Sequence, residues 1–207
     1  MRSALLMIDT QRDFLNGGAS PVPGTSVLLP AMGRLVEGYR FAGLPIVHAI
    51  RLYAGDDVDL PRRTALRDGA RIVRPGSSGA DIASALLPSP GVSLESDRLL
   101  KGAFQRVGDN EVVMWKPRWS AFYRTSLDEH LGKLGVNTTV LAGCNFPNCP
   151  RATLFDASER DYRVAVVDDA TSLATPDRLA DAALLGVHSV PTRAVLRRVA
   201  PEFVGTS

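Results

Sequence analysis

Residues 138–152, TTVLAGCNFPNCPRA, place an apolar β-rich run, a turn containing glycine and proline, and the start of a helix in direct succession. The run over residues 138–142 is expected as a buried strand. Pro150 suits the first position of a helix, because its missing N–H would be unpaired there anyway. Residues 152–160 carry apolar side chains at three- and four-residue spacing, as amphipathic helices do. This strand–turn–helix unit predicts a fold of the α/β class.

The same unit recurs along the chain. Several of the runs are near-continuously apolar, which predicts strands buried on both faces of a parallel sheet. We therefore expect one domain over residues 1–207, with three α/β/α layers and a six-stranded, mostly parallel sheet. Strands are expected at residues 3–8, 45–51, 111–115, 138–142, 163–167 and 187–190, and helices at residues 27–41, 125–134, 152–160 and 175–185. The region 52–110 is the least regular, and only residues 80–87 within it are expected to be helical.

The composition is that of an ordinary globular protein and limits the classes of partner. Lys and Arg number 24 and Asp and Glu 22, and no basic stripe with interleaved aromatics is present. Nucleic acids and membranes are therefore not expected as partners, and the composition favours a small ligand or a protein partner instead. The apolar run before Asp9 is too short for a membrane span or a signal-peptide core, which predicts a soluble, cytoplasmic protein.

Three expected strands end in residues capable of chemistry. In an open parallel sheet, ligands bind at the carboxyl ends of the strands. Cys149 is expected to cap the helix that follows residues 143–149, where the helix dipole would favour the nucleophilic thiolate. Asp9 could take and return the thiol proton, and Lys116 could hold both groups in their charged forms. The alternatives are a buried small apolar cysteine, an aspartate that caps a turn, and a surface lysine.

Several familiar motifs are missing. The sequence has no G-x-G-x-x-G after a strand, no G-x-x-x-x-G-K-[ST] and no G-x-S-x-G, so no dinucleotide or other cofactor is expected. The three histidines are scattered rather than spaced as zinc ligands. Cys144 and Cys149 are five residues apart and do not form a C-x-x-C pair.

Three blocks in the order 6–14, 116–122 and 140–157 carry a family resemblance. They read LMIDTQRDF, KPRWSAF, and VLAGCNFPNC followed by Ala152-Thr153 and Asp156-Ala157. The chain resembles the isochorismatase-like hydrolases, cysteine hydrolases that include nicotinamidases, N-carbamoylsarcosine amidases and streptothricin hydrolases. The resemblance implies a Rossmann-like sheet with strand order 3-2-1-4-5-6 and assembly as a homodimer or higher homo-oligomer.

The same resemblance implies the roles of the site residues. Asp9, Lys116 and Cys149 would form the catalytic triad. A cis peptide would join Cys144 to Asn145, and the N–H groups of Asn145 and Cys149 would form the oxyanion hole.

The chain also differs from the family pattern at several positions. Arg51 and Tyr53 stand at about the positions where nicotinamidases carry metal ligands, so neither a metal nor nicotinamide is expected. Phe146 stands in a turn where such proteins commonly carry small residues, and it is expected to reshape the pocket. Phe14, Arg51 and Phe146 are the expected substrate-binding residues.

The expected function is hydrolysis of a C–N bond in a small amide, lactam or carbamoyl compound through an acyl-enzyme on Cys149. Two alternative functions belong to other functional classes. The chain could be a non-catalytic ligand-binding or scaffolding protein with the same fold. It could also be a thiol redox sensor that uses Cys144 and Cys149.

Overall fold

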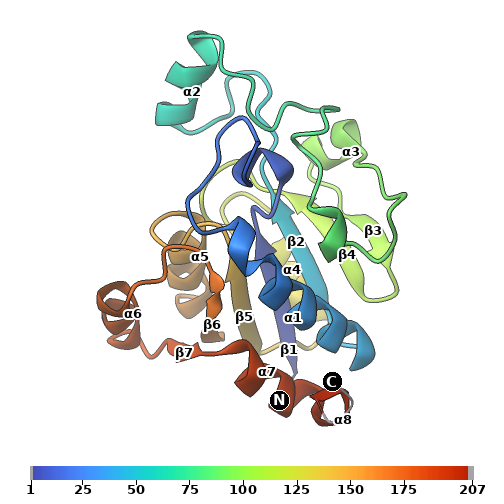
Figure 1. Ribbon diagram of the computed structural model, residues 1–207, viewed down its shortest axis with the longest axis vertical. Coiled ribbons are helices and arrows are strands. Elements are labelled where there is room, and N and C mark those ends of the chain that lie inside the picture. The colour runs from blue at the N-terminus through green and yellow to red at the C-terminus, as the bar shows by residue number, and fades with distance from the viewer. Residues whose placement is uncertain (1, 205–207) are drawn as a thin grey trace.

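A computed structural model of the protein describes residues 2–204, which form a seven-stranded sheet in the order β3-β4-β2-β1-β5-β6-β7 (Figure 1). All neighbouring strands are parallel except β3 and β4. The strands are β1 (Ser3–Ile8), β2 (Ile46–Ile50), β3 (Gln105–Gly108), β4 (Glu111–Trp115), β5 (Thr138–Gly143), β6 (Arg163–Thr171) and β7 (His188–Val190). The α/β class is confirmed, and the six expected strands stand in the expected order. The expected strand count was one too low, because β3 was not foreseen.

Helices cover both faces of the sheet, with α1 and α7 on the near side in Figure 1 and α4 and α5 behind it. The helices are α1 (Leu29–Phe41), α2 (Leu60–Arg67), α3 (Ser96–Leu100), α4 (Leu127–Lys133), α5 (Cys149–Ser158), α6 (Pro176–Ala183), α7 (Thr192–Val199) and α8 (Pro201–Val204). Short 3₁₀ turns lie at Arg12–Phe14, Ser26–Leu28 and Ser84–Leu86. Within residues 2–204, no helix has both the length and the apolar character that a membrane span requires.

The alternation of side chains along β1 explains why two helical layers are needed. Leu5 and Met7 join the apolar cluster under α1 and α7, whereas Leu6 and Ile8 join the cluster under α4 and α5. Every residue of β1 is buried, as expected for a central strand with both faces covered. The packing of both faces fixes the position of β1, and with it the position of Asp9, the residue directly after the strand.

The prediction of a helix over residues 80–87 is wrong. Only Ser84–Leu86 form a 3₁₀ turn, and Ala80 and Asp81 lie in a turn and a bend. Ile82 forms a β-bridge with Gln11, and the N–H of Ala83 donates to the carbonyl of Thr10. Pairing with the loop after β1 thus outweighs the weak local preference for a helix.

The segment that carries α2 lies beyond the carboxyl ends of the strands, at the top of Figure 1. Its two ends meet where the N–H of Tyr53 donates to the carbonyl of Val73 over 3.2 Å. The side chain of Asp13 accepts the N–H of Val73 at 2.6 Å, which ties this stem to the loop after β1. Residues 54–72 therefore form a closed excursion over the end of the sheet where ligands of this fold class bind.

Candidate active site

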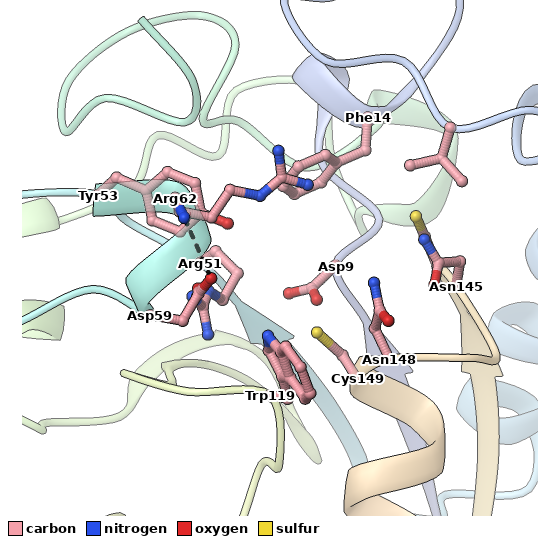
Figure 2. A pocket seen from close by; sticks show the side chains of 12 residues that line it. Asp9, Phe14, Arg51, Tyr53, Asp59, Arg62, Trp119, Asn145, Asn148 and Cys149 are labelled. Atoms are coloured by element: carbon pink, nitrogen blue, oxygen red, sulfur yellow. Dashed lines mark hydrogen bonds and ion pairs between the residues drawn. The ribbon is translucent and has the colours of Figure 1, made fainter. Parts of the chain in front are cut away.

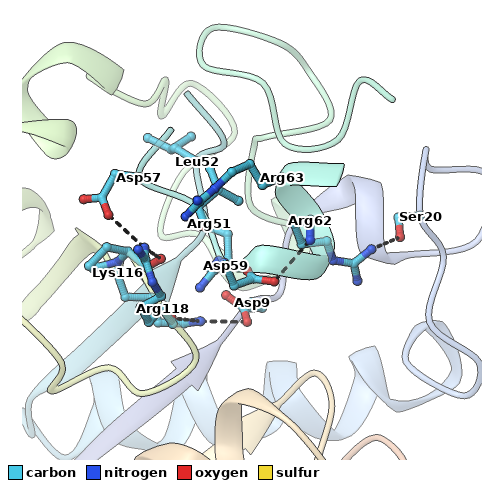
Figure 3. A network of polar contacts seen from close by, with 12 residues as sticks. Asp9, Ser20, Arg51, Leu52, Asp57, Asp59, Arg62, Arg63, Lys116 and Arg118 are labelled. Carbon is cyan, nitrogen blue, oxygen red and sulfur yellow. Dashed lines mark hydrogen bonds and ion pairs between the residues drawn. The ribbon is translucent and has the colours of Figure 1, made fainter. Parts of the chain in front are cut away.

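Asp9 and Lys116 form a buried ion pair at the carboxyl ends of β1 and β4. The Lys116 ammonium donates to Asp9 Oδ2 at 2.9 Å and to the carbonyl of Arg118 at 3.3 Å (Figure 3). Lys116 is fully buried, so the alternative of a surface lysine is wrong. The second oxygen of Asp9, Oδ1, is buried and has no partner within residues 2–204. The site thus holds a carboxylate with one oxygen fixed by a cation and one oxygen free to exchange a proton.

Cys149 begins α5, with Asn148 rather than Cys149 itself in the capping position. Its thiol faces the Asp9 carboxylate across the pocket (Figure 2). Burial first and the charge of Asp9 second raise the pKa of Cys149 to about 12, although Lys116 and Arg51 act in the opposite direction. The expected thiolate at the helix terminus is therefore wrong for this state, because desolvation outweighs the nearby positive charges. The free site holds a protonated thiol beside a carboxylate that can accept the proton.

The turn between β5 and α5 brings two backbone N–H groups to the nucleophile. The peptide between Cys144 and Asn145 is cis, and Gly143 before it has a φ of +123°. A Cβ on Gly143 would overlap the carbonyl oxygen of Ile8, so only glycine allows β1 and the turn to approach this closely. Within residues 2–204, no hydrogen bond joins the N–H of Asn145 or of Cys149 to a protein acceptor. Both donors are available to an oxygen placed in the pocket.

Arg51, directly after β2, is held by its backbone and by its side chain. Gln11 accepts the Arg51 N–H at 2.8 Å and donates to its carbonyl at 2.7 Å. The guanidinium pairs with Asp59 through Nη2 and lies 5.0 Å from the ring centroid of Tyr53. Burial would lower the pKa of Arg51, but Tyr53, Asp9 and the other neighbouring acidic groups raise it overall, so the side chain is charged. Arg51 Nη1 is buried without a partner in the described chain.

These groups line one small cavity of about 40 Å³ (Figure 2). Of the expected site residues, the structure brings Asp9, Phe14, Arg51, Asn145 and Cys149 to it, and Lys116 stands behind Asp9. The other lining residues were not among the expected site residues and are Val22, Tyr53, Asp59, Arg62, Trp119, Cys144 and Asn148.

One missed residue carried a readable signal. Asp59 precedes Leu60-Pro61, a pattern typical of a helix start, and it caps α2 by accepting the N–H of Arg62. The start of α2 could thus have been predicted, whereas its position over the pocket could not.

Phe146, one of the expected substrate-binding residues, does not line this cavity. Its N–H donates to the carbonyl of Ser172 at 2.8 Å, and its side chain belongs to the apolar cluster under α4 and α5. There the ring is 1% exposed and packs with apolar residues that include Leu154 and Ala182. The large residue in the turn fills the core instead of reshaping the pocket.

The two cysteines are free and buried. Burial, together with the charge of Asp9, raises the pKa of Cys144 to about 12, although the hydroxyls of Thr25 and Ser172 lower it. Cys144 is therefore a protonated thiol under the turn. Residues 2–204 contain no group of three or more His, Cys, Asp or Glu residues that could hold a metal ion.

Comparisons with known proteins agree with this architecture. Residues 3–194 match the isochorismatase domain model. A probable inactive nicotinamidase of Arabidopsis thaliana is 36% identical over 180 residues, covering 84% of this chain and 83% of the relative. A ureidoacrylate amidohydrolase of Methylobacterium radiotolerans is 28% identical over 206 residues, covering 89% and 72% of the two chains.

Among solved structures, an isochorismatase family protein of Desulfovibrio vulgaris superposes with a TM-score of 0.80 at 32% identity, covering 96% of this chain and 98% of the other. The likeness thus extends over both helical layers and the whole sheet. With a domain match over most of its length and relatives above 30% identity, the chain belongs to the isochorismatase family.

Proposed function

We propose that the protein is a cysteine hydrolase that cleaves a C–N bond of a small amide through an acyl-enzyme on Cys149. The convergence of Cys149 and Asp9 at one cavity, with Lys116 paired to Asp9 behind it, carries the proposal. A thiol becomes a useful nucleophile when an adjacent base removes its proton. Similarity to a protein named as an amidohydrolase supports the bond type.

In the first half of the reaction, Asp9 takes the proton of Cys149 as the sulfur attacks the carbonyl carbon. The oxygen of that carbonyl becomes negative and accepts hydrogen bonds from the N–H groups of Asn145 and Cys149. The tetrahedral intermediate collapses with rupture of the C–N bond. Asp9 gives its proton to the departing nitrogen, which leaves a thioester on Cys149.

In the second half, a water molecule attacks the thioester, and Asp9 takes a proton from it. The C–S bond breaks, the acid product leaves, and Cys149 recovers its proton from Asp9. Lys116 binds no substrate in this scheme. Its ammonium lies 2.9 Å from Asp9 Oδ2 and favours the charged form of that carboxylate each time the proton departs.

The alternative function is that of a ligand-binding protein without turnover. The name of the Arabidopsis relative, a probable inactive nicotinamidase, gives this alternative weight. Trapping distinguishes the two: a panel of amides is incubated with the protein, acid-quenched and examined by mass spectrometry. We expect an acyl mass increment that fragmentation assigns to Cys149, present in Cys144→Ala and absent in Cys149→Ala. Amide binding with neither an adduct nor release of ammonia or amine would favour the non-catalytic alternative.

Four further predictions go with this function. We propose that the protein forms one domain, requires no cofactor, is cytoplasmic, and assembles as a homodimer or higher homo-oligomer. Size-exclusion chromatography with light scattering tests the last of these, and a monomer at micromolar concentration would contradict it.

A further inference from the structure

A large open groove lies at the end of the sheet opposite the active site. Its volume is about 1320 Å³, against about 40 Å³ for the active-site cavity. The first residues of four neighbouring strands line it: Ser3 of β1, Thr138 of β5, Arg163 of β6 and His188 of β7. α7 forms one wall, at the lower end of the sheet in Figure 1. Because β5 is six residues long, about 20 Å of strand separates the groove from the active site.

The floor of the groove is apolar and incompletely covered. Ala165 stands beside Val140 where β6 pairs with β5, and Val190 stands beside Val167 where β7 pairs with β6. Ala165 and Val190 are only partly buried, at the margin of the apolar cluster under α1 and α7. On the α7 side the groove is lined by Ala194, whose small side chain fills little of it. Apolar surface of this kind is stabilised when another apolar group removes it from water.

The charged side chains that line the groove are all basic. They belong to Arg163, Arg197 and Arg198, and within residues 2–204 no aspartate or glutamate lines the groove. Arg163 and Arg197 are exposed, and neither forms an ion pair with a carboxylate of the described chain. A guanidinium presents its N–H donors in a fork that matches the two oxygens of a carboxylate. The groove therefore combines an apolar floor with two unpaired guanidinium groups.

This distribution of charge does not suit a second copy of the chain. In a twofold contact the same patch meets itself, so a residue of one copy faces the corresponding patch of the other. Arg163 and Arg197 would then approach basic residues, with no acidic residue in the lining to separate them, which is unfavourable. The complement of the groove is instead a molecule with an apolar body and an anionic end.

We propose that the groove binds a long-chain carboxylate, with the alkyl chain on the apolar floor and the carboxylate on Arg163 and Arg197. The floor crosses from β1 over β5 and β6 to β7, which is about 14 Å at about 4.8 Å between strands. A long alkyl chain covers this width, and a short one leaves part of it exposed to water. The groove shares no lining residue with the active-site cavity, so the inference is independent of the proposed hydrolase.

The binding of decanoate tests the proposal, measured by isothermal titration calorimetry on the wild-type chain below the critical micelle concentration. Decyltrimethylammonium has the same chain and the opposite charge, and octanoate has the same head group and two fewer methylene groups. We expect decanoate to bind about 10- to 100-fold more tightly than the cation, the range for hydrogen bonds to charged groups. It should bind about 10-fold more tightly than octanoate, because each buried methylene adds to the affinity.

Variants locate the ligand on the molecule. Arg197→Gln should weaken the binding of decanoate about 10-fold. Arg193→Gln is the matched control, because Arg193 is an exposed arginine of the same helix that does not line the groove, and it should leave the affinity unchanged. Ala165→Leu should weaken binding by occupying the path of the alkyl chain. Circular dichroism checks that this variant folds, and Ala194→Leu, at an exposed position of α7, replaces it if it does not.

Several results would overturn the proposal. They are no binding of decanoate at millimolar concentration, equal binding of the decyl cation, and an affinity that either Arg197→Gln or the leucine variant leaves unchanged. An oligomer that these variants dissociate, seen by light scattering, would identify the groove as an interface between copies. Arg197-dependent sedimentation with phosphatidylglycerol vesicles, in a protein that does not bind decanoate, would identify a membrane surface as the partner.

Discussion

Breaking the Asp9–Lys116 pair should cost more stability than removing both of its charges. The two charged atoms are 2.9 Å apart, and both side chains are at most 5% exposed. With an effective dielectric constant of about 20, their attraction amounts to about 6 kcal/mol. Removing one partner leaves the other charge buried and unpaired, and we expect Lys116→Met or Asp9→Asn to lower the free energy of unfolding by about 3–5 kcal/mol. The double variant has no buried charge at this place and should lose less than either single variant.

Urea denaturation of the four proteins at pH 7 measures this double-mutant cycle, and amide hydrolysis is measured in parallel. Stability should recover in the double variant while turnover stays absent, because the group that accepts the thiol proton is missing from both Asp9 variants. Additive losses of stability in the double variant would refute the reasoning, since they would show that the two charges do not interact. Turnover near the wild-type rate in any of the three variants would refute the role of the pair in the reaction.

Three other predictions concern the nucleophile, the turn and the absence of a metal. Only the thiolate of Cys149 reacts with iodoacetamide, and burial raises the pKa of this thiol to about 12. The rate of alkylation of Cys149 should therefore rise steadily from pH 7 to pH 10. A plateau of the rate below pH 8 would show that the thiolate is already present at neutral pH. Gly143→Ala should lower the free energy of unfolding, measured by urea denaturation, by more than about 4 kcal/mol. The Cβ of the new alanine would lie 2.8 Å from the Ile8 nitrogen and closer still to the Ile8 oxygen. Gly33→Ala is the control, because a Cβ at Gly33 in α1 meets open space, and it should change the free energy of unfolding by about 1 kcal/mol or less. Treatment with a strong chelator should leave the hydrolysis rate unchanged, and a loss that only added zinc, iron or manganese restores would contradict this.

The central strands could be predicted because their signal is local. Ser3–Ile8 is apolar from Ala4 onward, and Thr138–Gly143 places two β-branched threonines before the apolar run 140–142, a pattern typical of strands buried on both faces. β3 could not be predicted in this way, because QRVG becomes a strand only by pairing with β4 across a turn. The failure at residues 80–87 has a similar origin: their partner is the loop after β1, about seventy residues earlier in the chain.

The residues of the candidate site also differ in whether a local sequence signal marks them. Asp9, Lys116 and Cys149 were singled out because each follows or borders an expected strand end, and strand ends of a parallel sheet meet on one edge. Asp59 and Arg62 were missed, because nothing in the polar segment around α2 indicates that it lies over that edge. Phe146 was assigned to the pocket from its place in the turn, but its side chain is buried in the apolar core instead, and its place in the turn alone does not give the direction of a side chain.

We expect the closed excursion over residues 54–72 to be replaceable as a unit. Its ends are joined at Tyr53 and Val73. The loop that follows β1 holds both sides of this stem, because Gln11 binds the backbone of Arg51 just before it and Asp13 accepts the N–H of Val73. Doubling the length of such a loop costs only about 0.6 kcal/mol in closure entropy, so its size and sequence can vary widely without moving the nucleophile. Transplanting this block whole, with splice points at the stem, is therefore the shortest engineering route to a new substrate range on an unchanged reaction centre.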